Sequence, residues 1–173
     1  VTDEIVSTLD QGVTTYSNAG ETAKRGLELS GAARVGWGLE LGASYAWTRY
    51  RYVRFDELVR GVALDRSGKT LPFVPTHQWG LFAAWRHESG FRLRVQSSTW
   101  GSYWLDSANT ARYGGYSFLT SLGAAYARGR HELLLDVQNL LDLRYAVQAT
   151  RDTSGRDSYS AGAPRTLMLS YRF

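Results

Sequence analysis

The sequence lacks several residue types whose absence limits what the chain can be. Cysteine does not occur, which excludes a disulfide framework and a thiolate metal site. No apolar run approaches the ~18 residues of a membrane-spanning helix, so a chain of this composition can cross a membrane only as strands. Isoleucine occurs once, at Ile5, although β-branched residues normally fill the core of a soluble β-sandwich. Gly, Ala, Leu, Tyr and Trp take its place, which favours a crowded lumen and a membrane interface.

Charge and metal-ligand types exclude further classes. The formal net charge is +4, and the arginines are interleaved with Asp and Glu over the whole chain rather than gathered in one patch. This distribution argues against a nucleic-acid partner. The carboxylates of Asp56 and Glu57, and of Asp152 and Asp157, fall in polar stretches, where we expect them to be solvated. Three histidines are scattered without ligand spacing: His77, His87 and His131. The sequence therefore predicts no catalytic residue, no metal site and no cofactor.

Apolar and polar residues alternate with period two along much of the chain, which predicts about eight strands. The expected strands are 4–9, 26–35, 39–49, 79–85, 91–98, 117–126, 132–138 and 163–173. Short turns at 36–38, 88–90 and 128–130 alternate with longer polar loops at 10–19, 50–76, 103–114 and 141–162. Short turns on one side and long loops on the other are typical of an outer-membrane β-barrel, whose short turns are periplasmic. The predicted fold class is thus all-β, a transmembrane antiparallel barrel.

Aromatic residues support the same fold. In the last strand Leu167, Leu169, Tyr171 and Phe173 share one face, and we interpret them as the lipid-facing signal for outer-membrane insertion. One aromatic group lies beside the short turns: Trp37, Trp85, Phe91, Tyr126, Tyr171 and Phe173. A second group lies toward the long loops: Tyr45, Trp47, Trp79, Trp100, Tyr103, Trp104, Tyr116 and Phe118. Two aromatic girdles around an aliphatic band are expected at two membrane interfaces and not in a soluble lipocalin-like barrel.

Several motifs resemble those of the TonB-dependent outer-membrane receptors. They are Arg25-Gly26-Leu27-Glu28, Leu71-Pro72-Phe73-Val74-Pro75, Asn139-Leu140-Leu141-Asp142-Leu143-Arg144-Tyr145 and Gly162-Ala163-Pro164-Arg165, with the closing Tyr171-Arg172-Phe173. The segment 101–110 is similar to one common in the ferric-citrate branch. The resemblance implies a 22-stranded barrel of which residues 1–173 are the last eight strands, with the plug domain and the TonB box outside this chain. It also implies an outer-membrane location and the partners plug, TonB and a ferric chelate such as a siderophore or ferric citrate.

Two groups of polar residues are candidate ligand contacts. Arg92, Arg94 and Gln96 alternate on one strand and should face the lumen. The other group lies in the long loops: Arg51, Arg54, Arg60, Arg151 and Arg156. Arginine pairs bidentately with carboxylates, and a cationic mouth would speed the capture of an anionic chelate. The alternatives are a structural lining that holds the plug for the first group, and contact with anionic lipopolysaccharide for the second.

Other interpretations stay open at this point. A self-contained eight-stranded outer-membrane barrel with a structural or adhesive role fits the length, and so does a lipid-modifying enzyme or a soluble barrel. Small lumenal residues argue against closure at eight strands, because a small barrel must fill its interior with side chains. They are Gly42, Ala46, Gly80, Ala84 and Gly123. His77, the best-placed enzymatic candidate, shares its face with Trp79 and should point to lipid.

Overall fold

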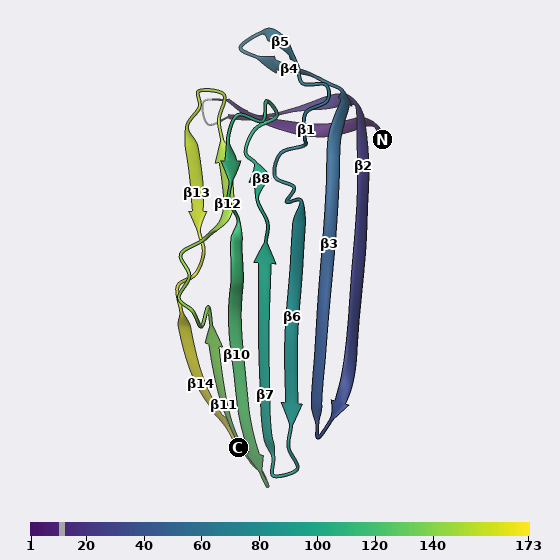
Figure 1. The fold of residues 1–173 in the computed structure, drawn as a ribbon. Helices are drawn as coiled ribbons and strands as arrows, with labels where there is room; N and C mark the ends of the chain where they lie inside the picture. The colour runs from purple at the N-terminus through teal and green to yellow at the C-terminus, as the bar shows by residue number, and fades with distance from the viewer. Residues whose placement is uncertain (11–12) are drawn as a thin grey trace.

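The computed structural model describes residues 1–10 and 13–173, and strands make up most of this part of the chain. Eight of the strands form one sheet: β1 (Thr2–Asp10), β2 (Val13–Gly36), β3 (Leu39–Arg54), β6 (His77–Arg86), β7 (Phe91–Trp100), β10 (Tyr116–Arg128), β11 (His131–Gln138) and β14 (Thr166–Arg172). Their spatial order is β1-β2-β3-β6-β7-β10-β11-β14, and each neighbouring pair is antiparallel (Figure 1). The all-β antiparallel prediction and the count of eight are therefore confirmed. No described residue belongs to a helix that is long and apolar enough to span a membrane.

Three small hairpins lie in the connections between strands of the sheet and do not pair with it. They are β4 (Asp56–Val59) with β5 (Val62–Asp65), β8 (Tyr103–Trp104) with β9 (Arg112–Tyr113), and β12 (Ala146–Arg151) with β13 (Asp157–Ala161). All three lie toward the long-loop end of the sheet, whereas the short turns and the C-terminus lie at the opposite end (Figure 1). From the turn at 36–38 onward the predicted alternation of short turns and long loops is thus confirmed, and Phe173 ends beside the short turns.

The strand register sorts side chains onto two faces. Leu29 pairs with Tyr45, and Val95 pairs with both Ala83 and Leu122, so these residues share one face. We call this surface the apolar face and the opposite one the polar face. Leu167, Leu169 and Tyr171 pair with Val137, Leu135 and Leu133 respectively, which places the predicted insertion signal on the apolar face. Leu167, Leu169 and Tyr171 stay exposed, as expected for a surface that lipid covers.

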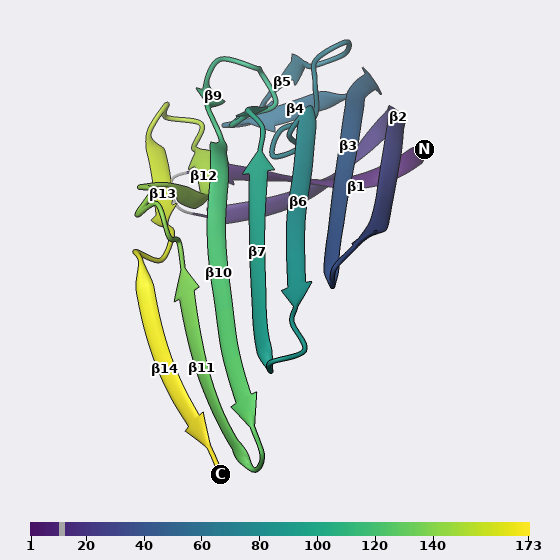
Figure 2. The same cartoon turned by 60° about the horizontal axis from the view of Figure 1, so that its bottom comes forward.

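The sheet is open rather than closed. Within the described residues no pairing joins β14 to β1, so each of these strands forms an edge. Figure 2 shows β14 at one side of the curved sheet and β2 at the other, with β1 crossing the long-loop end. A self-contained eight-stranded barrel would require that pairing, because unpaired backbone groups are not tolerated in hydrocarbon.

The prediction of a loop at 10–19 is wrong for most of that segment. β2 runs for 24 residues from Val13, and its first part pairs with β1 from Asp10↔Val13 to Thr2↔Glu21. Residues 11 and 12 lie outside the described part of the chain. The register shifts between Glu21 and Thr22, a β-bulge that bends the strand. Residues 13–21 do not alternate between apolar and polar, so the sequence pattern does not reveal this part of the strand.

The β1–β2 hairpin crosses the long-loop end of the sheet in both views (Figure 1, Figure 2). Val6 packs in a buried cluster with Tyr52, Phe55 and Leu71. Along β3, Tyr52, Tyr50 and Thr48 are two residues apart and so share one face. Trp47 and Tyr45 lie on the apolar face, so Tyr52 belongs to the polar face. The hairpin therefore folds over the polar face of the sheet.

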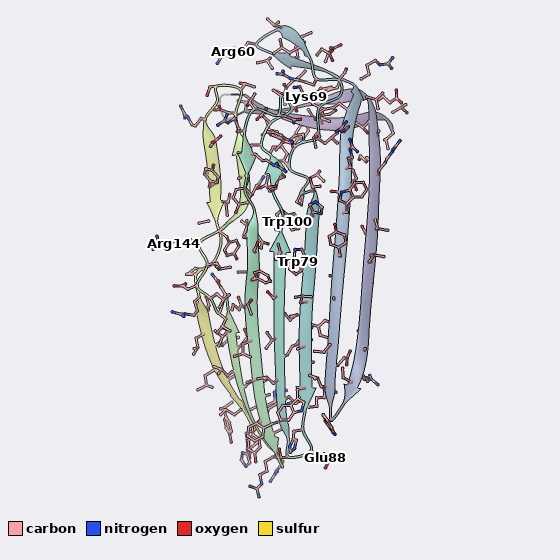
Figure 3. The ribbon with its side chains drawn as sticks, viewed as in Figure 1. Arg60, Lys69, Trp79, Glu88, Trp100 and Arg144 are labelled. Carbon is pink, nitrogen blue, oxygen red and sulfur yellow. The ribbon has the colours of Figure 1, made fainter. Side chains whose placement is uncertain are left out.

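The aromatic girdle beside the long loops is smaller than the sequence predicts. Trp79 and Trp100 lie on adjacent strands (Figure 3), but Trp79 pairs with Thr99 and Trp100 pairs with Gln78. The two tryptophans therefore project from opposite faces, and Trp100 belongs to the polar face. Tyr103 is buried in a second cluster with Leu105 and Ala149. Tyr45, Trp47, Trp79 and Phe118 remain as the upper girdle, and Phe118 meets Trp79 edge-on.

Two of the motifs interlock above β11 and β14. The Asn139 side chain, which is 3% exposed, donates hydrogen bonds to the carbonyl oxygens of Leu143 and Ala163 and accepts one from the Leu143 amide. The Arg165 amide donates to the Asp142 carboxylate. Gly162 lies against the Tyr145 ring, where any side chain would overlap the ring atoms. These contacts join the motif 139–145 to the motif 162–165 at the base of the long loop between β11 and β14. We call this set of contacts the latch.

Candidate functional site

Five segments wall a cavity of 610 Å³ at the long-loop end of the sheet. The segments are the β1–β2 hairpin, the β4–β5 hairpin, residues 72–73, the 105–110 loop and the β12–β13 hairpin. Tyr16, Leu64 and Phe73 supply apolar surface, while Ser107 and Thr150 supply hydroxyl groups. The volume lies within the range of about 300–1,000 Å³ that is usual for small-molecule sites.

Arg66 and Arg151, in the cavity wall, are each held in an ion pair. Arg66 Nε donates to Glu57 Oε2 over 2.8 Å, and both side chains are largely buried. Arg151 binds Asp157 through two hydrogen bonds, Nε to Oδ1 at 2.6 Å and Nη2 to Oδ2 at 3.0 Å. The hydrogen bond from Arg151 lowers the pKa of Asp157, and the same bond raises the pKa of Arg151. Both guanidinium groups therefore face the cavity with part of their charge already compensated.

The 105–110 loop is rigidly tied to its neighbours. The Asp106 carboxylate accepts hydrogen bonds from the amides of Thr110 and Ala111 and from the Thr110 hydroxyl. Asn109 bonds the Thr70 amide and carbonyl at 2.8 Å each, so it joins this loop to the chain that leads into β6. Such fixed loops hold the cavity wall in place before any ligand arrives.

Tyr103 anchors the β12–β13 hairpin from beneath. Its hydroxyl accepts a hydrogen bond from the Ala149 amide at 3.0 Å, and burial raises its pKa. Tyr113 bonds both the amide and the carbonyl of Ala146. The sequence predicts Tyr103 at the membrane interface, whereas the folded loops make it a core residue.

The predicted loop arginines do not gather in one place. Arg151 lines the cavity, whereas Arg156 is exposed in the adjacent turn, where its amide donates to Asp152 Oδ1 at 2.9 Å. Arg60 lies at the tip of the β4–β5 hairpin (Figure 3), and Arg54 is exposed at the end of β3. Arg51 lies between Tyr50 and Tyr52 of the polar face and therefore projects from the apolar face of β3.

The predicted lumenal residues lie on the polar face of β7, away from the cavity. Arg92 pairs with Glu132, which also accepts a hydrogen bond from Arg172 at 3.2 Å. Arg94 donates to Gln96 at 3.1 Å and stacks over the Phe82 ring. These contacts run along the wall toward the short-turn end and link β7, β11 and β14. The structure therefore separates them from the loop arginines.

Sequence reasoning missed the buried partner of Glu57. The expectation that Asp56 and Glu57 are solvated is wrong for Glu57, which is 6% exposed and bound to Arg66. Val59-Arg60-Gly61-Val62 forms the turn of the hairpin that brings the two together. The sequence signal that could have predicted this hairpin is the Arg60-Gly61 turn between two short segments that contain apolar residues. Asp157 is likewise engaged by Arg151 rather than only by water.

His77 lies on the apolar face, as its parity with Trp79 predicts. On β6, His77 lies two residues from Trp79, and it pairs with Trp47 of β3. The Tyr45 hydroxyl and His77 Nδ1 are hydrogen-bonded at 2.8 Å, and their rings stack. The position suits a membrane interface and places the imidazole away from the polar face.

Comparison with known proteins agrees with this geometry. Residues 1–140 match the family described as TonB dependent receptor-like, beta-barrel. The siderophore receptor PiuA from Acinetobacter baumannii covers 96% of this chain at 22% identity with a TM-score of 0.77, and the ferric yersiniabactin uptake receptor FyuA from Yersinia pestis covers 91% at 23% identity with a TM-score of 0.73. The ferric citrate transporter FecA covers 87% at 23% identity with a TM-score of 0.68.

At these identities the structural matches establish a shared fold. This chain spans 23% of PiuA and 24% of FyuA and FecA, about a quarter of each receptor. The open edges of the sheet agree with a segment of a larger barrel. The family match over residues 1–140 and the shared fold lead to one conclusion: the chain belongs to the β-barrel of the TonB-dependent receptor family, which lies in the bacterial outer membrane.

Proposed function

We propose that this chain forms the last eight strands of a TonB-dependent receptor that takes up a ferric chelate, a siderophore or ferric citrate. The observation that carries the proposal is the cavity of 610 Å³, walled by five segments at the extracellular end of the barrel wall. Loops that converge from separate strands on one hollow suit the first capture of a small molecule from outside.

The chemistry of the mouth favours an anionic chelate. Arg60 and Arg156 are exposed in the turns of the two hairpins that wall the cavity, where their positive charge would raise the local concentration of an anion. Arg151 contributes from the wall, with Asp157 orienting its guanidinium group. Hydroxyl groups of Ser107 and Thr150 offer hydrogen bonds to chelate oxygens.

The polar face supports a second part of the proposal. Arg92, Glu132 and Arg172 form a linked charged group near the short-turn, periplasmic end of the wall. We assign it to contact with a plug domain inside the complete barrel. Transport would then depend on TonB acting on that plug, as the family resemblance implies.

Uptake by the complete receptor tests the proposal. In a strain that lacks the native receptor, we would supply radiolabelled ferric siderophores and ferric citrate, with and without TonB. Thr150→Trp would fill the cavity, and Val147→Trp, on an exposed position of the same strand outside the cavity wall, is the matched control. We expect uptake of one chelate that needs TonB, reduced at least roughly tenfold by T150W and not by V147W.

Two results would contradict the proposal. Uptake that persists at the same rate without TonB would contradict the proposal that transport depends on TonB. Equal uptake by the T150W and wild-type receptors would contradict the proposal that the cavity captures the chelate.

A further inference from the structure

Two arginines and a histidine gather at the turn between β10 and β11, at the short-turn end of the sheet. Arg128, the last residue of β10, pairs with His131, the first residue of β11, and Arg130 lies in the turn between them. All three side chains are exposed. The end of β14 lies beside this turn in both views (Figure 1, Figure 2). We call Arg128, Arg130 and His131 the turn cluster.

The strand register places the turn cluster on the apolar face. Tyr126 pairs with Leu133, which pairs in turn with Tyr171 of the apolar face. Arg128 lies two residues beyond Tyr126, and His131 is its partner across the turn, so both project from that face. The cluster therefore faces lipid rather than the lumen, and it is far from the cavity at the long-loop end.

Contacts with the last strand hold the turn cluster in place. The Tyr171 hydroxyl is hydrogen-bonded to His131 Nδ1, and the two rings stack. The centre of the Phe173 ring lies 5.3 Å from that of the His131 ring and 5.6 Å from the Arg130 guanidinium group. An arginine that stacks on an aromatic ring keeps its N–H groups available for an anion. In the tautomer that lets the Tyr171 hydroxyl donate, His131 Nε2 carries the proton and is a further donor.

The height of the turn cluster matches the headgroup region of the leaflet at this end. Phe91 and Tyr126, whose ring centres are 4.4 Å apart, belong to the aromatic girdle beside the short turns. Strands rise about 3.4 Å per residue, so Arg128 lies at most ~7 Å beyond Tyr126. Aromatic girdles mark the membrane interface, and the lipid headgroups form the next layer outward. Leu93 and Leu169 are exposed on the membrane side of the girdle, where acyl chains would pack.

The positive charge of the turn cluster is not compensated by neighbouring side chains. Among the residues that the structure describes, neither Arg128 nor Arg130 forms an ion pair. Glu132 is next in sequence, but it projects from the polar face and is bound there to Arg92 and Arg172. On their apolar face the described strands β10, β11 and β14 carry no side-chain carboxylate. A bound anion would supply the missing counter-charge.

These surroundings select an anionic phospholipid. Guanidinium groups bind phosphate bidentately and are more weakly hydrated than ammonium groups, which suits a partly apolar interface. A zwitterionic headgroup would bring an ammonium group to a site that has no side-chain carboxylate to receive it, so the cluster favours a headgroup with net negative charge. We propose that Arg128, Arg130 and His131 bind the phosphate groups of anionic phospholipids, phosphatidylglycerol and cardiolipin, in the periplasmic leaflet. This site goes beyond the uptake of a chelate and does not depend on it.

Lipid binding by the complete, detergent-purified receptor tests the site. The variant R128Q/R130Q removes both guanidinium groups, and R128K/R130K keeps the charge without the bidentate geometry. Arg34→Gln is the matched control, because Arg34 is exposed near the same end of the sheet but pairs with Glu40 on the polar face. The probes are cardiolipin, phosphatidylglycerol, phosphatidylethanolamine and inorganic phosphate, with bound lipid measured by native mass spectrometry.

We expect cardiolipin and phosphatidylglycerol to bind the wild type and R34Q equally and the double glutamine variant at least roughly tenfold more weakly. The double lysine variant should fall between them, and phosphatidylethanolamine should not distinguish the wild type from the double glutamine variant. Equal binding of cardiolipin to the wild type and the double glutamine variant would overturn the proposal. Phosphatidylethanolamine bound by the wild type as tightly as phosphatidylglycerol would do the same. So would displacement of phosphatidylglycerol by inorganic phosphate at equal concentration, since it would assign the cluster to free phosphate.

Assembly is checked separately by the heat-dependent mobility of the barrel on gels. If the double variant does not assemble, the single variant R130Q replaces it and should still lose cardiolipin affinity relative to R34Q. Loss of chelate uptake with cardiolipin binding intact would count against the proposed transport function alone. The two proposals can therefore fail independently.

Discussion

The latch around Asn139 provides a sharp quantitative test of the structure. The side chain makes three hydrogen bonds, at 2.9 Å to the Leu143 carbonyl, 3.0 Å to the Ala163 carbonyl and 2.9 Å from the Leu143 amide. Each contributes about 1 kcal/mol net, and the site is too buried for water to replace them fully. Asn139→Ala should therefore cost about 3 kcal/mol of local stability. A further ~1 kcal/mol follows because Asn139 has a φ of 50°, a left-handed conformation that alanine adopts poorly.

Two further variants separate these contributions. Asn139→Gly loses the same hydrogen bonds but tolerates the positive φ, so it should be ~1 kcal/mol less destabilising than the alanine variant. Leu141→Ala is the control, since Leu141 is 58% exposed in the same turn and should change stability by less than about 0.5 kcal/mol.

Hydrogen–deuterium exchange of the complete receptor measures the effect directly. A loss of about 4 kcal/mol corresponds to exchange of the Leu143 amide nearly three orders of magnitude faster. Amides in the middle of β11 should be unaffected, because the latch lies beyond the end of that strand. Exchange within threefold of wild type in the alanine variant, or an alanine variant no worse than L141A, would refute the latch and its energetics.

Three other changes test separate parts of the molecule. Gly162→Ala should lower the yield of assembled barrel on gels, because its methyl group would overlap the Tyr145 ring, whereas Gly31→Ala, which has open space around it, should assemble normally. Glu57→Gln should weaken the buried pair with Arg66 by about 1–3 kcal/mol and speed tryptic cleavage of the β4–β5 hairpin on intact cells, and unchanged cleavage would exclude a stabilising role. The pKa of Asp157 is lowered from 3.8, so its bond to Arg151 stabilises the β12–β13 hairpin fully above that pH and is lost as pH falls through the lowered folded-state pKa. Exchange in this hairpin should rise steeply below about pH 3.8 in the wild type but not in Asp157→Asn, and identical pH profiles would contradict the assignment.

The membrane-spanning part of the fold was predictable because its physics is local. Each strand there has lipid on one side and the lumen on the other, so every second residue reports its own environment. Leu167 and Leu169 lie on the apolar face that alternation predicts, and His77 joins them there. Where the chain leaves the membrane this signal ends. The first part of β2 is a strand without apolar alternation, and the sequence assigned it to a loop.

The candidate site was less predictable because its residues act in pairs from distant segments. Arg151 was predicted as a ligand contact, and the structure shows in addition that it is bound to Asp157 across the β12–β13 hairpin. Glu57 was expected in water and is buried beside Arg66. Tyr103 was predicted to lie in the aromatic girdle at the membrane interface, but it is buried and accepts a hydrogen bond from the Ala149 amide. None of these partnerships follows from spacing, since each depends on how a loop folds back.

The sequence alone determined the all-β class, the number of strands in the main sheet, the direction of the last strand and the family, because alternation and short motifs are encoded residue by residue. The tertiary structure decided which arginines share a site. Strand pairing brought Arg130 of one turn beside Phe173 of the last strand, and loop packing placed Arg151 in the cavity wall. The physical reason is that a strand's own pattern specifies which way each side chain points, whereas its neighbours are specified only when strands and loops from distant positions come together.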